Sequence, residues 1–304
     1  VEVLAEVQIA DRANESKVEP YLHIFGFDEV GHTIDLTSQR VNELTELVDE
    51  SDDIIDDLVD SVAPEIVDKC GQREAKLAGL CSIVKGANHT DRNMVHSLFY
   101  GKRGSGKSKI MESLQEIAEN SQFADAQNAS SAGLTATVSQ TSKLQGEGEQ
   151  WVITAGTLPQ AHEGVAFVDE LDKVENRVQE VLATPMSSGR VIIKKAGEAK
   201  LTAETSIVSA ANPEDQTYDG GEPIDSLDIP VHIQNRFDLI LRVDDEVKEE
   251  AEEREIMRKI AKRKQGQYDS PMDKSTLRDY VALAKRQEVE MTSKAQEEII
   301  DRIL

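Results

Sequence analysis

A glycine-rich segment that follows a short apolar run has the composition of a phosphate-binding loop. Residues 101–108 read Gly-Lys-Arg-Gly-Ser-Gly-Lys-Ser and fit the pattern G-x-x-x-x-G-K-[ST]. In this pattern glycines let backbone N–H groups point inward, Lys107 reaches the β- and γ-phosphates of ATP, and Ser108 binds magnesium. The helix expected directly after the loop adds the positive end of its dipole. The candidate nucleotide-binding residues are Gly101, Gly104, Ser105, Gly106, Lys107 and Ser108.

A pair of acidic residues follows a second apolar run. Residues 165–168 predict a central strand, and Asp169 at its carboxyl end can hold the water shell of a magnesium ion. Glu170 can orient and deprotonate the water that attacks the γ-phosphate. The pair alone is equally typical of two solvated acids at a strand end. In a chain with a complete phosphate loop, it predicts an ATPase rather than a passive nucleotide binder.

Two further polar residues flank predicted strands. Asn212 follows the apolar run 206–211, and an amide at that position can hydrogen-bond the γ-phosphate or the lytic water. Arg236 precedes the apolar run 239–241. Arg236 could form an ion pair with Asp238, or it could complete the nucleotide site of a neighbouring subunit. The spacing alone leaves both alternatives open.

The elements that must position these residues follow from the apolar periodicity. Apolar residues recur at helical spacing over residues 109–118, directly after the loop, so strand, loop and helix alternate as in an α/β fold. Residues 1–35 alternate apolar and polar residues in two runs around a polar turn, which predicts a β-hairpin at the end of a small barrel. From residue 37 the period becomes helical.

Composition and charge limit the classes of protein. The 304 residues allow one large domain or two smaller ones, and no run reaches the roughly 20 apolar residues that span a bilayer, so we expect a cytoplasmic protein. No secretory leader opens the chain, and its start at Val1 suggests a fragment. Cys70 and Cys81 lack metal-like spacing and are interpreted as reduced structural residues.

The formal net charge is −24, from 58 acidic and 34 basic residues. Such a charge normally argues against binding to nucleic acid, because two polyanions repel each other. The acids are spread along the chain, however, and this pattern suits a salt-rich cytoplasm in which repulsion is screened. We therefore expect a halophilic source, and local basic residues must decide whether the protein binds nucleic acid.

Taken together, the segments resemble the minichromosome maintenance (MCM) helicases, a branch of the AAA+ ring ATPases. The resemblance rests on five segments: 61–66 (SVAPEI), 133–136 with 151–156, 164–174 (GVAFVDELDKV), 191–197 (VIIKKAG) and 235–241 (NRFDLIL). It implies an AAA+ domain with a parallel sheet flanked by helices. Its implied division is 1–36 as the end of an oligonucleotide-binding barrel, 37–60 as a linker helix, 61–245 as the ATPase domain and 246–304 as a truncated helical lid.

The resemblance also implies roles for single residues. Lys107 and Ser108 would bind phosphate and magnesium, Asp169 would ligate magnesium water, and Glu170 would activate the nucleophile. Asn212 would be the residue called sensor 1, and Arg236 would act on the ATP of the adjacent subunit. Lys194 and Lys195 lie in the segment that resembles the hairpin contacting DNA in the central pore of the family's rings. The implied protein is a homo-oligomer, in the family a hexamer, that uses ATP and magnesium to move along DNA in replication.

Three departures and two alternatives accompany the resemblance. The family usually has alanine before the loop lysine, where this chain has Gly106; zinc-ribbon cysteines are absent; and the chain stops before the sensor 2 arginine. One alternative is a different AAA+ ATPase that remodels proteins, as in the MoxR-like and magnesium-chelatase-like groups. The other is a scaffold that only binds nucleotide. Glu170 and Arg236 argue against a scaffold, and Lys194 with Lys195 favours DNA over protein.

Overall fold

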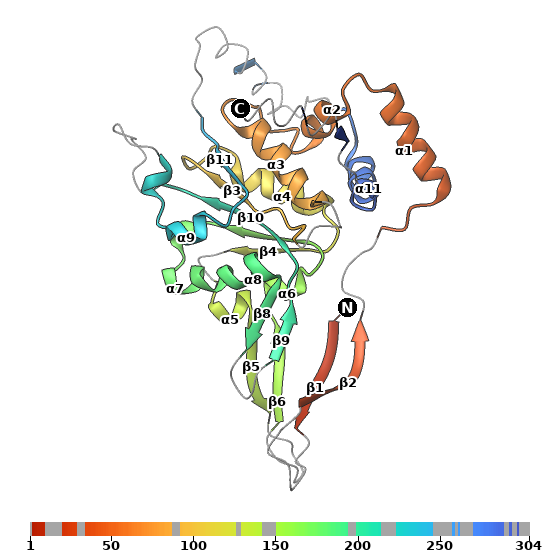
Figure 1. The fold of residues 1–304 in the computed structure, drawn as a ribbon. Coiled ribbons are helices and arrows are strands. Elements are labelled where there is room, and N and C mark those ends of the chain that lie inside the picture. The colour runs from red at the N-terminus through yellow and green to blue at the C-terminus, as the bar shows by residue number, and fades with distance from the viewer. Residues whose placement is uncertain are drawn as a thin grey trace.

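The fold was analysed in a computed structural model of the 304-residue chain. The residues described are 2–9, 20–28, 34–86, 92–125, 129–141, 150–193, 199–213, 223–245, 257–258, 261, 270–288, 292–293 and 297. The N-terminal hairpin is described by its backbone alone. Figure 1 shows a central sheet with helices on both faces and hairpins that extend away from it.

The central sheet has five strands, and all neighbouring pairs are parallel. In chain order the strands are β3 (Ser97–Tyr100), β4 (Ser121–Asp125), β7 (Val165–Asp169), β10 (Ser206–Ala211) and β11 (Leu239–Arg242). Their order across the sheet is β11-β3-β10-β7-β4. The inner strands β3 and β10 are buried at every residue, as expected for strands covered on both faces. The α/β fold class expected from the sequence is thus confirmed.

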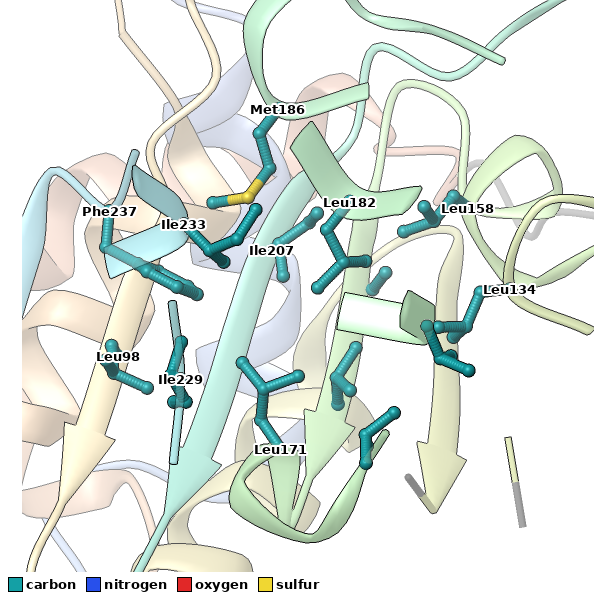
Figure 2. Packing of buried hydrophobic residues seen from close by; sticks show 14 of the residues in the cluster. Leu98, Leu134, Leu158, Leu171, Leu182, Met186, Ile207, Ile229, Ile233 and Phe237 are labelled. Carbon is teal, nitrogen blue, oxygen red and sulfur yellow. The ribbon is translucent and has the colours of Figure 1, made fainter. Parts of the chain in front are cut away.

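Side chains on the strands alternate between two hydrophobic clusters because successive residues of a strand point to opposite faces. On β3, Leu98 and Tyr100 belong to one cluster and Phe99 to the other. Figure 2 shows the first cluster, where Leu98 and Ile207 from the sheet lie among residues such as Met186. Full burial of one such side chain stabilises the fold by about 2 kcal/mol.

Helices of the second cluster cover one face of the sheet. These are α2 (Ile54–Ser61), α3 (Gln72–Val84), α4 (Lys107–Ile117) and α11 (Lys274–Lys285). The helix expected after the phosphate loop is therefore present as α4. The other face is covered by short elements, namely α5 (Ser131–Leu134), α6 (Thr157–Gln160), η2 (Leu171–Lys173), α7 (Asn176–Gln179), η3 (Glu180–Leu182), α8 (Ala183–Ser188), η4 (Pro223–Ser226) and α9 (Val231–Gln234).

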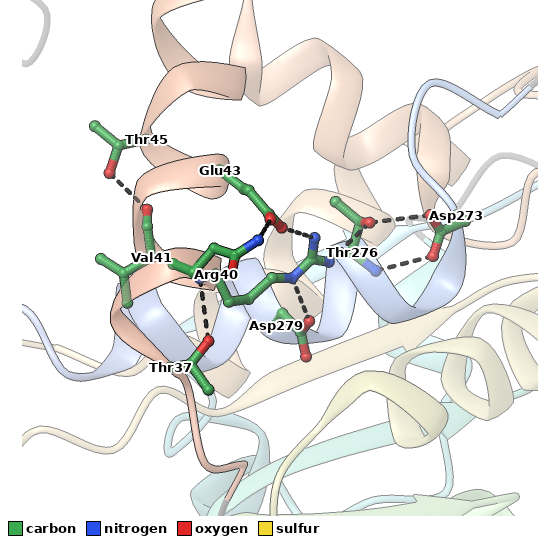
Figure 3. Close-up of polar contacts among 9 residues, drawn as sticks. Thr37, Arg40, Val41, Glu43, Thr45, Asp273, Thr276 and Asp279 are labelled. Atoms are coloured by element: carbon green, nitrogen blue, oxygen red, sulfur yellow. Dashed lines mark hydrogen bonds and ion pairs between the residues drawn. The ribbon is translucent and has the colours of Figure 1, made fainter.

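Helix α1 (Ser38–Glu50) packs on α11, although more than 200 residues separate them in the sequence. The side chain of Thr37 caps α1 by accepting a hydrogen bond from the backbone N–H of Arg40. Arg40 in turn donates to Asp279 at 2.7 Å and to Thr276 at 3.0 Å on α11 (Figure 3). One arginine thus joins the first described helix to the last long one.

The described residues form three antiparallel hairpins. They extend from this core (Figure 1). The expected N-terminal hairpin is present as β1 (Glu2–Ile9) and β2 (Pro20–Asp28). Strands β5 (Ala136–Thr141) and β6 (Gln150–Ala155) form the second, and β1 also pairs with β6, a contact that the sequence did not indicate. The third, β8 (Arg190–Ile193) with β9 (Ala199–Thr202), matches the hairpin expected around residues 191–200. Lys194 and Lys195 lie outside the described residues.

Candidate functional site

The phosphate loop lies between the end of β3 and the start of α4. Gly101 has a φ of 149°, and a Cβ there would lie 2.0 Å from the carbonyl oxygen of Val243, so only glycine fits. Gly106 precedes α4 with a φ of 97°, in the left-handed region that favours glycine. Ser105 between these glycines is buried, whereas Ser108 in the first turn of α4 is exposed. The sequence pattern therefore folds into the expected strand, loop and helix.

Lys107 is 5% exposed, and its side chain lies against the phosphate loop. Its Nζ donates hydrogen bonds to the carbonyl oxygens of Gly101 at 2.7 Å and Lys102 at 2.8 Å, and to Ser105 Oγ at 3.2 Å. Burial lowers the pKa of Lys107 to about 8, while the nearby carboxylates of Asp169 and Asp244 act in the opposite direction. The ammonium is thus positively charged at neutral pH and held where anionic phosphates would compete for it.

The two acidic residues stand at the carboxyl end of β7. The backbone N–H of Glu170 donates to Asp169 Oδ1 at 2.8 Å. Glu170 has a φ of 54°, which is uncommon for a residue with a side chain, and its carboxylate forms an ion pair with Lys173. Both side chains of this pair are about three-quarters buried, with exposures of 28% and 25%. The carboxylate of Glu170 is therefore held by a cation within its own loop.

Asn212 follows β10, which lies between β3 and β7 in the sheet. Its side chain is 9% exposed, and its backbone N–H donates to Asp172 Oδ1 at 2.9 Å. Burial raises the pKa of Asp172. Because the strands are parallel, the loop lysine, Asp169 and Asn212 all follow the carboxyl ends of adjacent strands. The structure thus brings these residues, which the sequence predicted, together at the carboxyl ends of the strands.

The donor set at this edge suits magnesium. Ser108 offers a hydroxyl oxygen and Asp169 a carboxylate, and Mg²⁺ prefers such oxygen ligands together with waters and substrate phosphates. Among the described residues, no group of three or more His, Cys, Asp or Glu side chains could hold a metal by itself. Cys70 and Cys81 are free thiols.

Arg236 lies at the opposite edge of the sheet. It precedes β11, whose first residue Leu239 is in register with Ser97 at the start of β3, whereas the phosphate loop follows the end of β3. Its guanidinium donates to the carbonyl oxygen of Ala183 at 3.3 Å and to Ser187 Oγ at 3.1 Å on α8, and also to His232 O. The structure does not bring Arg236 to the nucleotide residues of its own chain.

The alternative ion pair of Arg236 with Asp238 does not form in the described structure. Asp238 instead pairs with Arg92 at 3.1 Å and accepts a hydrogen bond from the backbone N–H of His96 at 2.8 Å. Arg92 stands just before β3, so Asp238 ties the beginning of β11 to the beginning of β3. Within the part of the chain that the structure describes, the guanidinium of Arg236 bonds to carbonyl and hydroxyl groups and to no carboxylate, which leaves its positive charge available to an anion.

Sequence reasoning missed Asp172, beside the nucleotide residues, and His96, at the amino end of β3. Asp172 lies in the motif of residues 164–174, and its place three residues after Asp169 was the signal available. His96 is fully buried, with Nδ1 accepting from the N–H of Ile207 at 3.0 Å and Nε2 3.1 Å from the carbonyl oxygen of Met186. No sequence signal marked it, because its partners lie far away along the chain.

The described residues contain no helix long and apolar enough to cross a membrane. Comparison with protein families matches residues 40–264, about three quarters of the chain, to the MCM P-loop domain. Similar proteins include a DNA replication licensing factor MCM4 from Drosophila melanogaster, 31% identical over 85% of this chain and 30% of the relative. A minichromosome maintenance protein MCM from Saccharolobus solfataricus is 32% identical over 82% of this chain and 36% of its own length.

A DNA replication licensing factor mcm7-B from Xenopus laevis is 28% identical over 85% of this chain and 36% of the relative. The chain spans about a third of the length of these relatives. The matched region contains the phosphate loop, the acidic pair, Asn212 and Arg236.

Proposed function

The chain belongs to the MCM family, and we propose that it is an ATP-driven DNA helicase or translocase acting in replication. In this proposal identical subunits form a hexameric ring around DNA, and each ATP is hydrolysed between two subunits. The proposal extends to a cytoplasmic location. The proposal rests on membership of the family, on the predicted nucleotide-binding residues gathered at the carboxyl ends of the strands, and on the position of Arg236.

The residues of one chain would divide the work as follows. The loop N–H groups and Lys107 would bind the phosphates, and Ser108 and Asp169 would hold magnesium. When bound, magnesium would neutralise charge on the β- and γ-phosphates. Glu170 would leave Lys173, orient the attacking water and accept its proton, and Asn212 would hold the γ-phosphate. The remaining nucleotide-binding residues are Gly101, Gly104, Ser105 and Gly106.

The observation that carries the proposal is that Arg236 and the phosphate loop of the same chain lie at opposite ends of the sheet, separated by the length of the strands. A four-residue strand spans about 13 Å, and Arg236 precedes β11 by three further residues. A closed ring repeats one heterologous interface, so two different surfaces of each subunit contact its two neighbours, and a residue far from its own loop can lie beside the loop of the next subunit. This arrangement would supply the arginine to the neighbour's γ-phosphate, where a positive charge stabilises the transition state.

DNA is the proposed substrate because of the β8–β9 hairpin. Its described stem ends at the pair Ile193 and Ala199, and Lys194 and Lys195 lie between these two residues in the sequence. Both this hairpin and the β5–β6 hairpin contribute side chains to the same hydrophobic cluster, and both extend from the sheet (Figure 1). In a ring, repeated lysines at this position would contact phosphates without reading sequence.

The proposal is tested by an assay of ATP hydrolysis and strand separation. The chain is assembled in molar salt and given a forked duplex, with ATP in one reaction and a non-hydrolysable analogue in another. We expect DNA to stimulate hydrolysis and strands to separate only with ATP. An assembled protein that hydrolyses ATP and ignores DNA would contradict the proposal and favour an AAA+ ATPase that remodels protein.

A further inference from the structure

Gln72 is the first residue of α3, and none of the roles above uses it. Its side chain is 2% exposed. It reaches the phosphate loop, although 33 positions separate it from Ser105 along the chain. A buried amide beside a ligand-binding loop needs an explanation, because burying polar atoms costs free energy unless their hydrogen bonds are formed.

All of the hydrogen-bonding capacity of the Gln72 amide is used. Its Nε2 donates to the carbonyl oxygens of Ser105 at 3.1 Å and Asp244 at 2.8 Å. Its Oε1 accepts from the backbone N–H groups of Lys69 at 2.9 Å and Cys70 at 2.6 Å. An amide has two N–H donors and two acceptor lone pairs, so each finds a backbone partner.

One of these contacts controls the phosphate loop directly. The carbonyl group of Ser105 and the N–H group of Gly106 belong to the same peptide unit, which is planar and trans. The two groups therefore point in opposite directions. Because Gln72 holds the Ser105 oxygen, the Gly106 N–H points away from Gln72, in an orientation in which it could donate to a phosphate bound by the loop.

The other contacts make Gln72 part of a rigid frame. Asp244 follows β11, its carboxylate is fully buried against Arg242 at 2.8 Å, and its backbone N–H donates to Cys70 O at 2.9 Å. Gly71 has a φ of 82°, and a Cβ there would lie 1.8 Å from the carbonyl oxygen of Arg242. This close approach of the segment before α3 to the end of β11 fixes the position of Gln72 relative to the sheet.

We propose that Gln72 is a positioning residue that keeps the Ser105–Gly106 peptide in its phosphate-binding orientation. The inference rests on the proposed function, because it takes the loop to bind ATP. Without the two N–H donors, this peptide can rotate and present a carbonyl oxygen to the phosphates, which repel it. Phosphate contacts exist in both the ground and transition states. Loss of the Gln72 donors should therefore weaken the affinity for ATP and leave kcat nearly unchanged.

The test compares Gln72→Met, Gln72→Glu and Ser82→Ala by titration with a fluorescent ATP analogue and by kcat at saturating ATP. Gln72→Met removes all four hydrogen bonds, whereas Gln72→Glu keeps the acceptors for Lys69 and Cys70 and removes the donors. Ser82 is the matched control: it is buried on the same helix, and its hydroxyl contacts Ala78 O and Ser97 Oγ away from the loop. Thermal unfolding of the nucleotide-free variants reports on folding.

We expect both Gln72 variants to bind nucleotide about tenfold more weakly or worse, with kcat within about twofold of wild type. Ser82→Ala should bind as wild type does. Unchanged affinity in either folded Gln72 variant, a loss confined to kcat, or an equal loss in Ser82→Ala would overturn the inference. A wild-type chain that binds no ATP would instead overturn the proposed function and the inference with it.

Discussion

At the scale of single residues, substitutions of Lys107 and Glu170 are expected to impair different steps, ATP binding in one case and hydrolysis in the other. Lys107→Ala should abolish ATP binding, because the buried ammonium neutralises phosphate charge in ground and transition states alike. Glu170→Gln should bind ATP normally and stop hydrolysis, because the carboxylate acts on the attacking water. Nucleotide titration and phosphate release separate the two effects. Lys109→Ala is the control, since Lys109 is half exposed and pairs with Glu112. Full turnover by Glu170→Gln would remove Glu170 from the mechanism.

His96 should make the fold sensitive to mild acid. Burial lowers the pKa of its imidazole from 6.5 to about 4, and the protonated ring could not accept the N–H of Ile207. Because the pKa of His96 is lower in the folded chain than in the unfolded chain, the stability that it contributes is fully present above the unfolded-state pKa of 6.5. This stability is lost as the pH falls toward 4. We expect the free energy of unfolding to drop by about 2 kcal/mol between pH 7 and 5 from this residue.

Denaturant unfolding at these two pH values, in wild type and His96→Gln, measures this contribution. The glutamine can still donate and accept hydrogen bonds but does not titrate, so the variant should lose less stability than wild type. Equal losses in the two proteins would show that His96 is not the source of the acid sensitivity.

Residues that the sequence pattern could reveal are those that form a local motif. Gly101 to Ser108 are contiguous, and the chemistry of phosphate binding constrains Gly101, Gly106, Lys107 and Ser108. Gln72 carries no such mark, because its partners Ser105 and Asp244 are 33 and 172 positions away. Its role depends on the pairing of β11 with β3, which only the folded chain contains.

At the scale of elements, the β8–β9 hairpin should couple hydrolysis to DNA. Replacing Lys194 and Lys195 together with alanine should leave ATP binding and basal hydrolysis nearly intact, because neither residue touches ATP in the proposed arrangement. DNA stimulation and unwinding should be lost, because the local positive charge facing the phosphate backbone disappears. Lys200→Ala in the stem is the matched control. Unwinding by the double variant at the wild-type rate would place the DNA contact elsewhere.

Strands with strong apolar runs could be predicted from sequence, and weak ones could not. Strand β10 covers residues 206–211, the same span as the apolar run. Strand β4 has the sequence SQFAD, with two apolar residues, and it exists because it pairs with β7 at the edge of the sheet. The pairing of β1 with β6 is likewise a tertiary contact that neither segment signals alone.

At the scale of the whole molecule, we propose that the net charge of −24 reflects a halophilic source. Salt screens repulsion among carboxylates, so the melting temperature and ATPase rate should both rise from dilute buffer to molar potassium chloride. Surface ion pairs such as Arg73 with Asp60 weaken in salt and act in the opposite direction, but each contributes little. A melting temperature that falls steadily with added salt would count against this origin.

The division of the chain into a barrel end, a linker helix, an ATPase domain and a lid remains a prediction. Helices α1 and α11, assigned to the linker and the lid, pack on each other, and Arg286 donates to Glu119 at 3.0 Å beyond the end of α4. Glu119 also accepts the backbone N–H of Ile34 at 2.8 Å. Glu119, just after α4, is therefore bonded both to the segment before α1 and to the residue that follows α11.

Subunit mixing tests whether two chains build each active site, as we propose. Lys107→Ala and Arg236→Ala should each be inactive alone, whereas Arg177→Ala, an exposed arginine, should remain active. When the two inactive proteins are mixed equally, about a quarter of the interfaces join an intact loop to an intact arginine. We expect hydrolysis to return in the mixture. A mixture that stays inactive, while differently tagged chains are recovered in the same oligomers, would contradict it.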